Sequence, residues 1–321
     1  MIIFLYGEDA FRSSQKLKEI KEKFLKSDPA ASGLSVCDFG DKAKTEEVIN
    51  ILGTPNLLAP KRLVIIKNLI KNGTDTDQGK ILEFIKKNKK DLETSRDLVV
   101  VFWEGEKIQK NNALGKILMA GKAQEFEKLS GLKLNQWINK RIKEIDIKAG
   151  ISQPALDKLV LYAGNDMFLL DNEIQKLASY AGGKTISEEM VELLVKANLD
   201  SNIFNTIDAL GAKNKREALK LLHRHLGQGE DPFYIFSMFI YQFRNLLKIA
   251  DYKENSGMGE REIANVSKMH PYVVRKSLGQ IQRFSFGQLK KIYAKLLALD
   301  VKIKTGKIDI QLALDKFIVE L

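Results

Sequence analysis

The sequence contains little cysteine, histidine and proline. Its single cysteine, Cys37, excludes an intramolecular disulfide. One cysteine and three scattered histidines argue against a zinc site, so no metal is expected. Only six prolines occur among 321 residues, which favours long helices over an all-β fold.

Long hydrophobic runs are also absent. The longest dense apolar run, Leu98 to Trp103, is far too short to span a membrane. The N-terminus has neither the basic region nor the apolar region of a secretory signal. No low-complexity tract appears. We therefore expect a cytoplasmic chain that is folded throughout and has no membrane contact.

Positive charge is plentiful, with a formal net charge of +11 and a pI near 9.4. This balance favours a polyanionic partner such as DNA or a nucleoprotein assembly, although a lysine-rich proteome that needs only solubility explains it equally well. A length of 321 residues predicts about two or three domains.

Strand and helix patterns alternate over residues 1–130. The expected strands are Ile2–Leu5, Leu34–Phe39, Leu63–Ile66, Leu98–Trp103 and, more weakly, Ala123–Phe126. Such alternation predicts a parallel sheet with helices on both faces. Strand patterns then disappear, and we expect a helical lid domain over 131–200 and a helical collar domain over 201–321. The fold class is therefore α/β plus all-α, with the layout of a clamp-loader-type (AAA+-like) ATPase.

The first strand and helix have the order of a phosphate-binding loop without its chemistry. The P-loop pattern G-x-x-x-x-G-K-[ST], started at Gly7, calls for glycine, lysine and serine or threonine where this sequence has Arg12, Ser13 and Ser14. Only Ser14 fits. The missing glycine and lysine would curl the backbone around phosphate and neutralise its charge. We expect either no nucleotide fold or a degenerate P-loop that binds no nucleotide, and hence no cofactor.

Two other positions of an ATPase also depart from its chemistry. The third strand ends in Lys67-Asn68 where acidic residues would hold Mg²⁺, and Met167 stands where a lid arginine is expected. Glu104 and Glu106 follow the fourth strand, and we interpret them as solvated loop charges because no lysine or metal partner accompanies them. Together with the P-loop, these positions make three departures from ATPase chemistry. Three departures favour a relative of the ATPases that does not hydrolyse nucleotide.

Several short stretches along the chain match a known family in their order and spacing. They are Tyr6-Gly7-Glu8-Asp9, Thr54 to Leu58 leading into Lys61 to Val64, Gly164-Asn165-Asp166 leading into Asn172 to Leu177, Leu297 to Asp300, Lys304-Thr305-Gly306 and Ala313-Leu314. No single motif is decisive, but their order and spacing across the three expected domains are specific. On these stretches the chain resembles the delta subunit family of bacterial DNA polymerase III over essentially its full length.

The resemblance implies a subunit that binds and opens the sliding clamp (beta) without hydrolysing ATP. It also implies that the chain assembles into a heteropentamer with ATPase subunits and a delta-prime subunit. Through this complex the chain would reach primer-template DNA. The implied clamp-binding residues are Leu57 and Leu58, although the family often has phenylalanine at the second position. No catalytic activity is expected from the chain alone, which would serve a nucleotidyltransferase holoenzyme.

Alternatives remain at each site. Two adjacent leucines before Pro60 cannot easily both face the core of a short helix, so one or both are candidates for an exposed anchor; equally, both could pack under the sheet. A basic helix end at Lys302, Lys304, Thr305 and Lys307 is either a DNA contact or a solvated charge run. The whole chain could instead be a divergent AAA+ ATPase that uses Arg12 or another base, or a free-standing DNA-binding protein.

Overall fold

The structure is a computed structural model that describes residues 1–321 except 42, 55–60, 96, 110 and 197–198, and it also leaves out the side chains of 93 and 199–202. The chain divides into unit 1, Met1–Leu129, and unit 2, Ser130–Leu321. The predicted combination of an α/β part and a helical part is confirmed. The further boundary near residue 200 stays a prediction.

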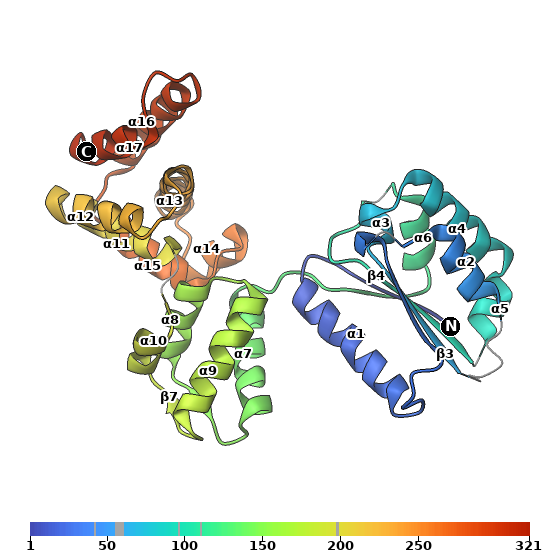
Figure 1. The fold of residues 1–321 in the computed structure, drawn as a ribbon. Helices are drawn as coiled ribbons and strands as arrows, with labels where there is room; N and C mark the ends of the chain where they lie inside the picture. The colour runs from blue at the N-terminus through green and yellow to red at the C-terminus, as the bar shows by residue number, and fades with distance from the viewer. Residues whose placement is uncertain (42, 55–60, 96, 110, 197–198) are drawn as a thin grey trace. The chain divides into compact units, whose positions relative to one another are not determined.

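Unit 1 is a five-stranded parallel sheet in the order β2-β3-β4-β1-β5. Helix α1 lies on one face of the sheet, and α2, α3, α4 and α6 lie on the other (Figure 1). The elements are β1 Ile2–Tyr6, α1 Ala10–Leu25, β2 Leu34–Asp38, a short 3-10 turn Phe39–Asp41, α2 Thr45–Gly53, β3 Arg62–Lys67, α3 Leu69–Asn72, α4 Asp75–Lys87, α5 Lys89–Thr94, β4 Leu98–Trp103, α6 Ala113–Met119 and β5 Lys122–Glu125.

The middle residues of the central strands are apolar on both faces of the sheet, and helices cover both faces. In β3, Val64 and Ile66 pack under α2 and α4, whereas Leu63 and Ile65 pack under α1. Side chains alternate between the two faces of a strand, so each face needs its own set of apolar residues. Edge strand β5 is exposed at every position, which explains its weak sequence signal.

Unit 2 is helical. Its elements are α7 Gly131–Ile145, β6 Gly150–Ile151, α8 Gln153–Ala163, α9 Met167–Ala181, β7 Thr185–Ile186, α10 Glu188–Leu194, α11 Leu199–Gly211, α12 Lys215–Gly227, α13 Pro232–Glu254, α14 Glu260–Ser267, α15 Pro271–Ile281, α16 Phe286–Lys304 and α17 Ile310–Val319. Strands β6 and β7 form a small parallel pair that the sequence did not predict. Two residues per strand are too few to display an alternating pattern.

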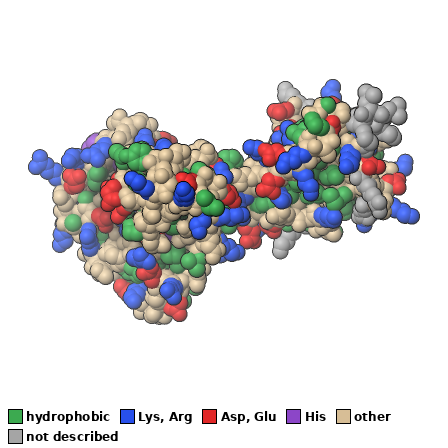
Figure 2. Space-filling model, turned by 90° about the horizontal axis from the view of Figure 1, so that it is seen from below, with side chains coloured by type: hydrophobic (Ala, Val, Ile, Leu, Met, Phe, Trp, Pro, Cys, Tyr) green, Lys and Arg blue, Asp and Glu red, His purple; other side chains and the backbone are tan. Residues whose placement is uncertain are grey.

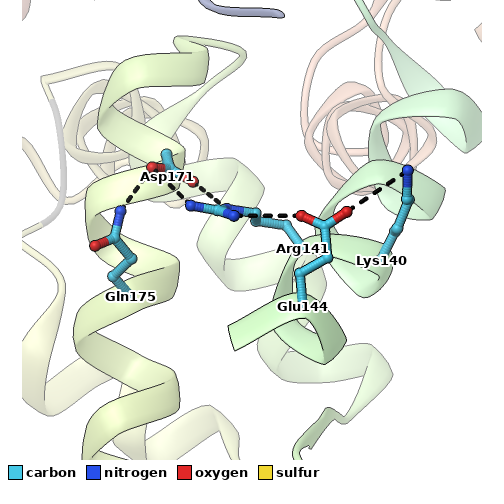
Figure 3. A network of polar contacts seen from close by, with 5 residues as sticks. All are labelled: Lys140, Arg141, Glu144, Asp171 and Gln175. Atoms are coloured by element: carbon cyan, nitrogen blue, oxygen red, sulfur yellow. Dashed lines mark hydrogen bonds and ion pairs between the residues drawn. The ribbon is translucent and has the colours of Figure 1, made fainter. Parts of the chain in front are cut away.

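A polar network fastens α7 to α9 (Figure 3). The Arg141 guanidinium places Nε 2.5 Å from Asp171 Oδ1 and Nη2 3.4 Å from Asp171 Oδ2. Gln175 donates to the same carboxylate, and Glu144 contacts both Arg141 and Lys140. Asp171 is almost wholly buried, so its charge requires these partners.

The core of the C-terminal part of unit 2 surrounds the long helix α13. Phe239 and Phe243 of α13 meet Phe317 of α17 edge-on, with ring centroids 5.4 and 5.9 Å apart. All three rings are fully buried. Edge-to-face contacts of this kind add to the stabilisation from burial alone.

Candidate functional site

The loop between β1 and α1 is only three residues long, from Gly7 to Asp9. Gly7 has a φ of 126°, and its N–H donates to the Glu106 carbonyl at 3.0 Å. A Cβ at position 7 would lie 2.4 Å from the Phe126 carbonyl oxygen. The backbone therefore packs against the chain after β5 and leaves no space at Gly7 for a phosphate.

A buried carboxylate occupies the N-terminus of α1. Asp9 is 3% exposed, and its side chain accepts the Arg12 backbone N–H at 2.9 Å. The Arg12 guanidinium pairs with the same carboxylate at 2.6 Å and also donates to the Glu127 carbonyl. A helix N-terminus is where phosphate-binding folds hold their anion. Here the protein supplies its own anion and its own counter-charge.

The two serines of the loop are used within the fold. Ser13 is fully buried, its Oγ donates to the Ala10 carbonyl at 3.2 Å, and it accepts the Trp103 indole N–H at 3.1 Å. Ser14 Oγ donates to the Phe11 carbonyl at 2.8 Å. The structure thus brings Gly7, Arg12, Ser13 and Ser14 together at the start of α1, where each makes contacts within the fold. That they bind no nucleotide stays a prediction.

The other two positions that were compared with an ATPase lie at the end of β3 and at the start of α9. Lys67, at the end of β3, lies 4.0 Å from Asp38, and the Asn68 amide donates to the same Asp38 carboxylate at 2.8 Å. Met167 is the first residue of α9 and is buried. Among the residues that the structure describes, no group of three or more His, Cys, Asp or Glu side chains could hold a metal ion.

Glu104 was wrongly interpreted as a solvated charge. It is 2% exposed at the end of β4, and its carboxylate accepts the backbone N–H groups of Ile70 at 2.7 Å and Lys71 at 3.3 Å. Burial raises the pKa of Glu104 to about 7, although the two N–H groups oppose the shift. Glu106 is the exposed charge that was expected, and it pairs with Lys71.

The raised pKa of Glu104 predicts a pH-dependent stability of unit 1. Between pH 4.5 and about 7 the carboxyl ionises in the unfolded chain but keeps its proton in the folded one. The free energy of unfolding should therefore fall as the pH rises through this window, by up to about 3 kcal/mol. Glu104→Gln keeps an acceptor for the Ile70 N–H but removes the ionisation, so its stability should change less.

Urea unfolding at pH 5 and pH 8 tests this expectation. Trp103 lies in unit 1, and in a Trp137→Phe background it is the sole tryptophan and reports on that unit. If the Glu104→Gln variant loses as much stability between the two pH values as the protein that keeps Glu104, this carboxyl is not the source of the pH dependence.

The predicted clamp-binding residues Leu57 and Leu58 lie outside the described residues. The elements on either side of them are tied together, because Arg62 at the start of β3 donates to the carbonyls of Ile51 at 2.9 Å and Thr54 at 2.5 Å. These hydrogen bonds fix where the segment leaves α2 and enters β3. The role of Leu57 and Leu58 stays a prediction.

The predicted DNA-contact residues gather at the C-terminal end of α16. Lys304 pairs with Asp300 at 2.8 Å, and Thr305 Oγ1 donates to the Val301 carbonyl. Lys302 and Lys307 are exposed there. Cations stabilise the C-terminus of a helix through its dipole, so the fold alone accounts for part of this charge. A DNA contact at these residues stays a prediction.

An apolar groove of about 610 Å³ runs between α13 and α16. Its rim includes Phe233, which is 60% exposed, and Leu297, which is 63% exposed, beside Tyr241. The Arg244 guanidinium spans the groove to the Tyr293 hydroxyl at 3.0 Å. Exposed apolar groups that line a hollow are typical of a protein contact.

Comparisons with known proteins agree over the whole chain. The profile of the family "DNA polymerase III, delta subunit" matches residues 4–127, and that of its C-terminal domain matches residues 200–321. The DNA polymerase III subunit delta of Bacillus subtilis (strain 168) is 26% identical over 320 residues, covering 99% of this chain and 91% of the relative. The probable DNA polymerase III subunit delta of Aquifex aeolicus (strain VF5) is 22% identical over 315 residues, covering 93% and 85%.

A solved structure agrees as well. The DNA clamp loader delta protein of Bacillus subtilis matches with a TM-score of 0.59 and 25% identity, covering 99% of this chain and 94% of that one. Within the part of the chain that the structure describes, no helix combines the length and apolar character needed to cross a membrane. This chain belongs to the DNA polymerase III delta subunit family of clamp-loader proteins.

Proposed function

We propose that this chain binds and opens the sliding clamp and does so without hydrolysing ATP itself. The observation that carries the proposal is the Asp9 carboxylate at the N-terminus of α1, in a chain of the clamp-loader delta family. A nucleotide phosphate would meet a buried anion in a loop too short to enclose it. Unit 1 has the parallel sheet of a nucleotide-binding domain, but its proposed function is to bind the clamp through its surface.

Leu57 and Leu58 are the proposed clamp contact. Two adjacent leucines shortly before Pro60 cannot easily both face the core of a short helix, which makes one or both candidates for an exposed anchor. Tighter binding to the open ring than to the closed ring would shift the clamp toward opening. ATPase subunits of the complex would then control when this surface is presented.

The remaining partners follow from the same role. Residues 131–200 would act as a lid domain and residues 201–321 as a collar that joins the ATPase subunits and delta-prime in a heteropentamer. The groove between α13 and α16 supports this role, because Phe233 and Leu297 would be covered by a neighbouring subunit. Primer-template DNA would be reached through the complex.

Clamp binding measured with and without ATP and Mg²⁺ tests the proposal. The purified chain should bind immobilised clamp equally well in both conditions, and calorimetry should detect no ATP binding. Micromolar ATP binding with Mg²⁺-dependent turnover would instead identify a divergent ATPase, and absence of clamp binding would overturn the proposed role.

A further inference from the structure

The positive charge of the chain is concentrated in its C-terminal part. Residues 201–321 carry 20 Lys and Arg against 12 Asp and Glu, a net charge of +8 out of the total of +11. Residues 130–200 have nearly balanced charge, with 9 Lys and Arg against 10 Asp and Glu. A local excess of this size indicates a surface that attracts a polyanion.

Within this part, α12 presents a stripe of cations, which we call the α12 stripe: Arg216, Lys220 and Arg224. All three are exposed and follow one another at intervals of four residues, so they share one face of the helix. The opposite face carries the buried Ala218 and Leu222 and anchors the helix. Figure 2 shows Lys and Arg side chains gathered at the left-hand end of the view, where α12 lies in Figure 1.

The fold accounts for only part of the α12 stripe, since Arg224 lies in the last turn, where the helix dipole favours a cation. Among the described residues, no acidic group forms an ion pair with Arg216 or Arg224, and Lys220 has only Glu217 at 3.7 Å. Arg216 lies in the first turn, where the helix dipole disfavours a cation. Like charges four residues apart also repel one another on a helix. Arg216 and the repulsion between neighbouring cations therefore oppose helix formation, and an anionic partner that covered the stripe would relieve this repulsion.

Other polar groups of α12 contact the neighbouring helix α17. His223 lies 3.0 Å from Asp315 of α17, and Lys215 donates to the Val319 carbonyl at the end of the same helix. These two groups join α12 to α17. Neither group belongs to the α12 stripe, which is an exposed cationic face of α12.

We propose that the α12 stripe binds the phosphate backbone of DNA. Arg216 and Arg224 are eight residues apart, which is about 12 Å along a helix. One DNA strand carries a phosphate about every 3.4 Å along the duplex axis, so three contacts fit in this length. Two of the three cations are arginines, whose planar fork binds phosphate oxygens in pairs. The inference is independent of the proposed clamp contact, which lies in unit 1.

Fluorescence anisotropy with a labelled duplex of about 20 base pairs tests the proposal in the full chain. The variant Arg216→Gln/Lys220→Gln/Arg224→Gln should bind at least about tenfold more weakly at low salt. Its slope of log affinity against log salt should fall by about 2.7, or about 0.9 for each phosphate contact. Its thermal melting temperature should not fall, because the three side chains are exposed and mutually repulsive.

The matched control is Lys133→Gln/Lys140→Gln/Lys143→Gln, which removes the same charge from exposed positions of α7. Under the proposal this variant keeps nearly the wild-type affinity and salt slope. The proposal is overturned if the α12 variant binds like the wild type, or if the control loses as much affinity as the α12 variant does. It is also overturned if the α12 variant keeps its DNA affinity but no longer assembles with the ATPase subunits, because the stripe would then be a protein interface.

Discussion

Replacing Leu57 and Leu58 with alanine should weaken clamp binding by roughly two to four orders of magnitude. Each leucine that becomes fully buried in a partner contributes about 1.5–3 kcal/mol. Loss of both therefore removes about 3–6 kcal/mol, and each 1.4 kcal/mol changes Kd about tenfold. Interferometry with immobilised clamp measures this change directly, and the circular dichroism spectrum should stay that of the wild type.

Exposed leucines elsewhere provide the control for this change. Leu132 is 73% exposed and Leu193 is 68% exposed, and both lie in unit 2. The variant Leu132→Ala/Leu193→Ala removes the same number of apolar atoms and should bind the clamp with wild-type affinity. If the two double variants have equal Kd values, the clamp contact does not lie at Leu57 and Leu58.

Gly7→Ala should destabilise unit 1 by about 3 kcal/mol or more. A φ of 126° strains any residue with a Cβ, which costs about 1–3 kcal/mol. The added methyl would also lie 2.4 Å from the backbone oxygen of Phe126, and the strand end must move to make room. Overpacking of this kind typically costs a further 1–3 kcal/mol or so. Nothing flexible is available to relieve the contact.

Urea unfolding followed by Trp103 fluorescence measures this effect, again in the Trp137→Phe background. Gly79→Ala is the control, because Gly79 lies inside α4 and a Cβ there would meet no atom within 4 Å. That change should instead stabilise unit 1 by about 0.5–1 kcal/mol, since alanine loses less entropy than glycine in a helix. A Gly7→Ala protein as stable as the wild type would show that the loop can shift away from Phe126.

The fold could be predicted where a pattern repeats over several residues. β3 and β4 are buried on both faces, so their uninterrupted apolar runs identified them as strands of a covered parallel sheet. The helix starts at Asp231-Pro232 and Ser285 can also be recognised from the sequence, because side-chain caps depend on adjacent residues only. Strands β6 and β7 were missed because their pairing joins residues far apart in the sequence.

The site was less predictable, because its chemistry depends on distant contacts. The sequence does not distinguish a glutamate that faces water from one that is buried. Glu104 follows a strand and accepts a backbone N–H from the segment after the neighbouring strand, a contact that depends on the fold. The departures from a P-loop at Arg12 and Ser13 were visible in the sequence. The reason that they fit together was not, since Arg12 binds Asp9 and Glu127, and Ser13 binds Trp103.

The strand order also determines when unit 1 can fold during synthesis. β1 is complete by residue 6, but its two partners in the sheet are β4, which begins at residue 98, and β5, which begins at residue 122. At about 5–20 residues per second, the ribosome needs roughly 5–20 seconds to reach β4. During that interval β1 has both of its edges free, and the β2–β3 pair has no central strand. Because β4 pairs with both β1 and β3, β1 can join the β2–β3 pair only after β4 has been synthesised.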